Sequence, residues 1–88
     1  MRILSIRRAI DDGGRRFRLR AFYDVQLTDE IRLFGLQLMQ APDGRLLTFA
    51  PAKHGMKVVT FAPNLAEQLT NLAAIELEGS NAHDRTAA

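Results

Sequence analysis

Four side chains in one stretch of the chain have the types and spacing of a nucleic-acid-binding surface. Arg16, Arg18, Arg20 and Phe22 alternate with apolar residues in the longest alternating run of the sequence, residues 16–27. Because successive side chains of a strand point to opposite faces, this run predicts a strand with one buried face and one face in water. The arginines would then stand about 7 Å apart, since a strand rises roughly 3.3 Å per residue, and could follow a phosphate backbone. Phe22 extends the row and could stack on an unpaired base.

The distribution of charge supports an acidic partner. Residues 1–20 hold seven arginines and two aspartates, a net charge of +5, whereas the remaining 68 residues hold five basic and eight acidic residues, a net charge of −3. Such asymmetry favours binding to a phosphate backbone. The simpler explanation is a solvated, arginine-rich strand face. If a helix or a second subunit covers that face, Phe22 is buried and the arginines form only its rim.

Three more basic residues complete the candidate site. Arg7 lies on the first predicted strand, which a turn at residues 11–14 brings back beside residues 16–27. Lys53 and Lys57 bracket a short basic loop that also contains His54. We interpret His54 as an exposed loop residue, because no second His, Asp or Glu stands beside it to form a metal or catalytic site.

The residue constellations that catalysis needs are missing from the sequence. We find no nucleophile with a base, no paired carboxylates, no metal set and no phosphate loop. The run at residues 11–14, Asp-Asp-Gly-Gly, lacks the spacing and the terminal Glu of a calcium loop. We therefore expect a protein that is not an enzyme and needs no cofactor, metal or small-molecule substrate.

Strand patterns dominate the first two thirds of the chain. Residues 31–40 are apolar on both parities, which is typical of a central strand or of a strand in a subunit interface. The segments 46–51 and 58–63 share one pattern that ends in Pro, which predicts two strands of similar environment. The predicted strands therefore cover residues 3–10, 16–27, 31–40, 45–50 and 58–62.

After Pro63 the apolar period becomes helical. A stripe formed by Leu65, Leu69 and Leu72 predicts a helix over about residues 64–77, with Pro63 at its start and Gly79 at its end. This helix would cover the sheet and form a core with Leu19, Tyr23 and Val25. The expected fold is α+β, a small antiparallel sheet of about five strands with one C-terminal helix packed on it. Residues 1–78 would form the single domain, and residues 79–88 a disordered tail.

The size of the chain makes self-association an expectation. A chain of 88 residues forms one domain with a small core, and without cysteine it has neither a disulfide nor a thiolate metal site. Since residues 31–40 are apolar on both parities, we expect a homodimer. The sequence shows no secretory segment and no apolar run near the roughly 20 residues of a membrane span. We therefore expect a cytoplasmic protein that does not bind membranes.

The order of these segments resembles the sporulation-protein-G (SpoVG) family of bacteria over residues 3–77. The similar segments are Ile6-Arg7-Arg8, the Asp12-Gly13 turn, Arg20-Ala21 before Val25-Gln26-Leu27, the strand around Ile31, the Gly44 turn, Ala50-Pro51-Ala52-Lys53 and the helix after Pro63. The resemblance implies a small α+β domain that forms homodimers, binds DNA or RNA in the regulation of gene expression and has no catalytic activity.

The chain departs from the family pattern in two places. The loop after Pro51 is short, and the helix lacks the basic residues expected around it, which makes binding through the helix doubtful. The alternative hypothesis is a protein-interaction module whose exposed sheet edge receives a partner strand. Salt separates the two hypotheses, because phosphate binding weakens steeply with salt and edge pairing does not.

Overall fold

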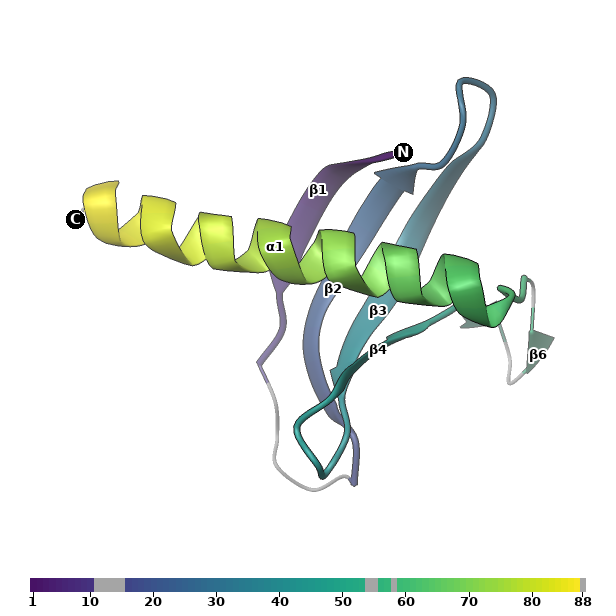
Figure 1. Ribbon diagram of the computed structural model, residues 1–88, viewed down its shortest axis with the longest axis horizontal. Coiled ribbons are helices and arrows are strands. Elements are labelled where there is room, and N and C mark those ends of the chain that lie inside the picture. The colour runs from purple at the N-terminus through teal and green to yellow at the C-terminus, as the bar shows by residue number, and fades with distance from the viewer. Residues whose placement is uncertain (11–15, 54–55, 58, 88) are drawn as a thin grey trace.

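A four-stranded antiparallel sheet with one long helix across it forms the body of the protein (Figure 1). The computed structural model describes residues 1–10, 16–53, 56–57 and 59–87. The sheet has the order β1-β2-β3-β4, and α1 crosses one of its faces. The element bounds are β1 Arg2–Arg8, β2 Arg18–Gln26, β3 Arg32–Gln40, β4 Leu46–Phe49, β5 Ala52–Lys53, β6 Met56–Lys57 and α1 Pro63–Ala87. The predicted α+β class is therefore confirmed.

The predicted fifth strand at residues 58–62 is wrong. Residues 59–62 are not in a strand, Val58 lies outside the described residues, and the small β5–β6 ladder stands apart from the main sheet. After β4 the chain has to leave the edge of the sheet and reach the start of α1 on its face (Figure 1). Phe61 packs against the core on this path, so the apolar pattern serves burial of a connecting segment.

The core lies between α1 and the sheet. Its buried members on α1 follow a four-residue spacing, Leu69, Ala73 and Leu77, with Leu65 partly buried one turn earlier, as expected for one face of a helix. Leu72 lies off this stripe and Leu19 lies outside the core, so these two core predictions are wrong. The strands contribute five buried residues: Ala21, Tyr23, Val25, Leu36 and Leu38.

A register shift in β2 explains why Leu19 misses the core. Leu19 pairs with Met39, but Ala21 pairs with Leu38, so one extra residue, Arg20, is inserted between them. An extra residue of this kind is a β-bulge, and it reverses the alternation of side chains beyond it. The face of β2 that carries Ala21 is therefore not the face that carries Leu19.

Two further bulges lie opposite Asp24. In β1 the register shifts between Ile3 and Ser5. In β3 two residues, Phe34 and Gly35, lie between Leu33 and Leu36, the partners of Val25 and Tyr23. Gly35 has a φ of 74°, a left-handed conformation that glycine adopts without steric cost. Asp24 thus faces a bulge in each neighbouring strand.

The helix α1 is longer than expected. It continues through Gly79 to Ala87, across the segment predicted as a disordered tail, and its C-terminal part projects past β1 (Figure 1). A glycine ends a helix efficiently when it takes a left-handed conformation, but the glycines with positive φ in the described residues are Gly35 and Gly44. Within the described residues no helix combines the length and apolar character needed to cross a membrane.

Candidate nucleic-acid interface

The strand pairing shows which side chains lie on the face of the sheet opposite α1, here called the open face. Tyr23 is buried on the helix side, so its neighbour Phe22 points to the open face. Phe22 pairs with Arg7 of β1 and with Gln37 of β3, and Gln37 pairs with Phe49 of β4. These pairs form one row across all four strands, the Phe22 row: Arg7, Phe22, Gln37 and Phe49.

Most of the aromatic residues gather on the open face. The chain has five phenylalanines, and Phe61 packs on the helix-side core. The Phe17 ring contacts the Phe49 ring, with centroids 5.7 Å apart and planes tilted by 55°, a favourable tilted arrangement. Phe34, in the bulge opposite Asp24, is 61% exposed, and Phe49 is 39% exposed. Single exposed phenylalanines are ordinary, but two exposed rings beside the half-buried Phe17 and Phe22 form a coherent apolar surface on one face of a small sheet.

A second row lies toward the start of β2 and is wholly aliphatic. It consists of Leu19, Met39 and Leu47. Met39 is buried and yet absent from the helix-side core, which agrees with its place on the open face. These side chains give the open face a packed apolar floor beside the aromatic rings.

Basic residues flank the far end of the open face. Ile3 and Val25 pack on the helix side, so Gln26 and its partners point to the open face. Gln26 pairs with Arg2 on β1 and with Arg32 on β3, and Arg32 Nε donates a hydrogen bond to Gln26 Oε1 at 2.8 Å. Both arginines are exposed, so their guanidinium groups can meet a phosphate.

Asp24 organises the centre of the open face. Its Oδ2 accepts hydrogen bonds from Ser5 Oγ at 2.8 Å and from Arg7 Nη1 at 3.3 Å, and its Oδ1 accepts one from Gly35 N at 2.9 Å. Burial raises the pKa of Asp24, but the bonds from Gly35, Ser5 and Arg7 and the Arg7 charge outweigh it and lower the pKa overall. The ionised carboxylate therefore holds Arg7 in place next to Phe22.

Arg7 keeps binding capacity despite this ion pair. Its Nη1 contacts both Ser5 Oγ and Asp24 Oδ2, while its side chain remains 55% exposed. A guanidinium group has five N–H donors in a fixed fork. The donors that face away from Asp24 are available to an incoming phosphate oxygen.

The predicted row of Arg16, Arg18 and Arg20 beside Phe22 is interrupted by the bulge in β2. Arg18 pairs with Gln40, whose other partner Leu46 packs on the helix-side core, so Arg18 lies on the helix side. Arg20 is half-buried and donates from Nη1 to Gln40 Oε1 at 2.7 Å. The two residues therefore do not continue the line of Phe22.

Arg16 stays close to the open face. It is exposed and lines a hollow with Phe17 and Leu47, and it lines a second hollow with Arg18 and Gln40 beside the turn at Pro42. Arg16 thus stands at the end of the apolar floor.

The two lysines of the candidate site are described only by their backbone. Lys53 pairs with Met56 and Ala52 pairs with Lys57 in the β5–β6 ladder, beyond the end of β4 (Figure 1). His54 and the turn predicted at residues 11–14 lie outside the described residues.

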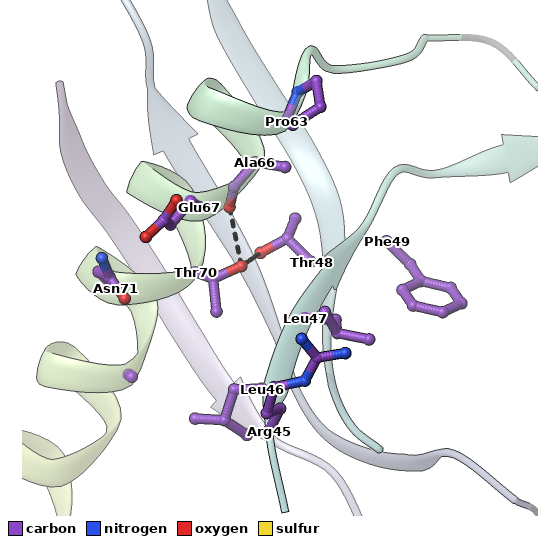
Figure 2. A pocket seen from close by; sticks show the side chains of 11 residues that line it. Arg45, Leu46, Leu47, Thr48, Phe49, Pro63, Ala66, Glu67, Thr70 and Asn71 are labelled. Carbon is purple, nitrogen blue, oxygen red and sulfur yellow. Dashed lines mark hydrogen bonds between the residues drawn. The ribbon is translucent and has the colours of Figure 1, made fainter. Parts of the chain in front are cut away.

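A groove of about 690 Å³ between α1 and β4 is lined by Thr48 and Thr70, whose hydroxyl groups are hydrogen-bonded to each other (Figure 2). Tyr23 Oη lies 2.6 Å from Thr48 Oγ1, which lies 2.7 Å from Thr70 Oγ1. Thr70 donates to the Ala66 carbonyl at 2.8 Å, so Thr48 must donate to Thr70 and accept from Tyr23. Burial raises the pKa of Tyr23 to about 12, and the Thr48 bond only partly opposes this.

This groove offers little chemistry. In the part of the chain that the structure describes, no buried side-chain nitrogen or oxygen lacks a hydrogen-bond partner, and no three His, Asp or Glu residues come together to hold a metal ion. The hydroxyl chain joins β2, β4 and α1.

Comparison of the chain with protein-family models, with curated proteins and with solved structures finds no match. The site therefore rests on its geometry. Of the residues placed on or beside the open face, the sequence-based prediction named Phe22, Arg7 and Arg16 and did not name Arg2, Arg32, Phe34 and Phe49. The apolar residues on both parities of 31–40 indicated a second apolar face that includes Phe34. The places of Arg2, Arg32 and Phe49 follow only from the pairing of the strands.

Proposed function

We propose that the protein binds single-stranded DNA or RNA on the open face of its sheet. The observation that carries the proposal is the Phe22 row, in which an arginine, two phenylalanines and a glutamine follow one another across four adjacent strands. Exposed rings stack on unpaired bases, a glutamine amide can hydrogen-bond a base edge, and an arginine can bind the neighbouring phosphate.

The chemistry of the open face favours single strands over duplex. Phe34 and Phe49 project from a broad sheet surface rather than from a helix that could enter a groove. A duplex hides the faces of its bases by stacking, so these rings would meet only sugar and phosphate. Arg2 and Arg32 at one end and Arg16 at the other can hold the backbone of a strand that crosses the aromatic surface.

In this proposal the protein is a non-catalytic regulator that acts in the cytoplasm, and the non-catalytic regulatory role is the one implied by the resemblance to the SpoVG family. The proposed contact residues differ from those predicted from the sequence. The contact surface is centred on Phe22 with Arg7, Arg2 and Arg32, and Arg18 and Arg20 belong to the opposite side or to the bulge.

The test compares Phe22→Ala with the wild type on an oligonucleotide in single-stranded and duplex form, measured by fluorescence anisotropy at low salt. Loss of base stacking should cost about 1–3 kcal/mol of single-strand affinity, and duplex affinity should change little. Ile75→Ala is the matched control, because Ile75 is 67% exposed on α1, away from the open face. Absence of single-strand binding by the wild type, or an equal loss on duplex, would overturn the proposal.

A further inference from the structure

The two edges of the main sheet differ in their readiness to pair with another strand. The β1 edge carries three arginines, Arg2, Arg7 and Arg8, and a register shift at Leu4. Charges and bulges are the devices by which proteins prevent edge pairing. The β4 edge, Leu46–Phe49, has neither a charged residue nor a proline, and its register with β3 is regular. Within the described residues, β4 has a neighbouring strand on one side only.

The hydrogen-bond pattern shows which backbone groups β4 presents at this edge. Ala41 N donates to Arg45 O at 2.8 Å, which identifies residues 41 and 45 as a hydrogen-bonded pair. Such pairs alternate along an antiparallel ladder. Leu47 and Phe49 therefore direct their backbone groups toward β3, and Leu46 and Thr48 direct theirs toward the free edge.

This pattern is self-complementary, and we propose that β4 pairs antiparallel with β4 of a second copy about a twofold axis at Leu47. Leu46 of each copy then faces Thr48 of the other, and each of these two pairs exchanges both backbone hydrogen bonds. The two Leu47 side chains face each other directly across the axis. The interface is closed and uses the same patch twice, as a twofold dimer requires.

The pairing extends the sheet without covering the open face. A twofold axis perpendicular to the sheet keeps both helices on one side and both open faces on the other. Leu47 and Phe49 lie on the open face of β4, so the two aromatic surfaces meet at the axis and form one longer surface. This last step rests on the proposed function, whereas the pairing of β4 strands does not.

The experiment introduces charged side chains at the proposed twofold axis. Leu47→Lys and Leu47→Glu each place like charges directly opposite each other, which destabilises a cross-strand pair, and each should raise the dimer dissociation constant by about tenfold or more. An equimolar mixture of the two variants should restore dimers as mixed pairs, seen by native mass spectrometry. Leu4→Lys at the β1 edge is the control and should leave the dimer unchanged.

Three outcomes would overturn the pairing: a monomeric wild type, a Leu47→Lys variant that remains a dimer of wild-type strength, or a mixture of the two charged variants that stays monomeric. Hydrogen exchange of the wild type gives a second readout that needs no variant. The amides of Leu46 and Thr48 should lose protection on dilution, and the Leu47 amide should not. All these measurements omit nucleic acid, so a failed dimer and a failed Phe22 experiment are distinguishable.

Discussion

Asp24 and Gly35 are joined by a hydrogen bond in which the Gly35 N–H donates to Asp24 Oδ1 at 2.9 Å. The bond fixes the bulge of β3, while the other oxygen of the same carboxylate binds Ser5 and Arg7 beside the bulge of β1. One side chain of β2 therefore fixes irregularities in both neighbouring strands. Bulges bend a strand and increase its twist, so Asp24 contributes to the shape of the sheet as well as to the placement of Arg7.

Replacement of Asp24 should destabilise the protein in a pH-dependent way. Asp24→Ala leaves the Gly35 N–H without its acceptor, which should cost about 1–3 kcal/mol of unfolding free energy. The folded-state pKa of Asp24 lies below its unfolded value, so its contribution is complete above about pH 4 and is lost as the pH falls through the folded-state pKa. The unfolding free energies of the wild type and Asp24→Asn, measured by urea titration, should therefore become equal at acidic pH. A difference that is constant with pH would contradict the assignment.

Gly35→Ala should destabilise the protein through its backbone. A Cβ at Gly35 meets no atom within 4 Å, but the φ of 74° is left-handed, a conformation that costs a residue with a Cβ about 1–2 kcal/mol. Gly79 is the matched control, because it also has open space around it but lies within α1. Gly79→Ala should stabilise the helix by up to about 1 kcal/mol. Thermal melting measures both changes, and equal effects would refute the role of the backbone angle.

Ionisation of Tyr23 should weaken the fold in alkali. The folded-state pKa of about 12 exceeds the unfolded value of about 10, so the stabilisation is present below about pH 10 and is lost as the pH rises toward the folded value. Because of this group, the free energy of unfolding should fall by at most about 1.4 kcal/mol per pH unit. Tyr23 is the single tyrosine and the chain has no tryptophan, so tyrosinate absorbance reports it alone. Tyr23→Phe should abolish this component of the slope; an unchanged slope would contradict burial.

Truncation of Leu69 should show how tightly α1 is held to the sheet. Leu69 is fully buried between α1 and the sheet, so Leu69→Ala should cost about 2–5 kcal/mol of unfolding free energy. Ile75→Ala, on the solvent side of the same helix, should change the free energy of unfolding by less than about 0.5 kcal/mol. Chemical denaturation of both variants provides the comparison, and a loss below half a kcal/mol at Leu69 would mean that the helix does not depend on this packing.

Local patterns predicted the strands well and their irregularities poorly. The alternation of residues 16–27 and the turn residues around Gly44 correctly indicated β2 and the connection from β3 to β4. The bulge at Arg20 was not predictable, because alternation in one strand carries no information about where its partner skips a residue. One such skip moved Leu19 from the expected core to the open face and Arg18 to the helix side.

The helix illustrates the same limit. Pro63 marked its start correctly, but Gly79 did not mark its end, since a glycine stops a helix by adopting a left-handed angle and Gly79 does not adopt one. The candidate site was half predictable for a related reason. Phe22 is recognisable from its own strand, whereas Phe34 and Phe49 become part of the site only when β3 and β4 are paired in the observed register.

The positions of Arg32 and Arg18 on opposite faces of the sheet predict which of them binds nucleic acid. Arg32 is exposed at the end of the open face, beside Gln26, and Arg18 is also exposed but lies on the helix side. If a strand crosses the open face, Arg32→Ser should weaken binding to all sequences similarly and reduce the salt slope by about 0.7, the value for one phosphate contact on a single strand. Arg18→Ser should leave both quantities nearly unchanged.

Anisotropy titrations at several salt concentrations measure the two slopes on the same oligonucleotide. Arg20→Ser is a third variant with a different expectation, because it removes the hydrogen bond to Gln40 and should lower stability by about 0.5–1.5 kcal/mol without changing the salt slope. The reverse result, in which Arg18 and Arg20 carry the salt dependence and Arg32 does not, would place the phosphate path on the helix side of the sheet and remove the open face as the binding surface.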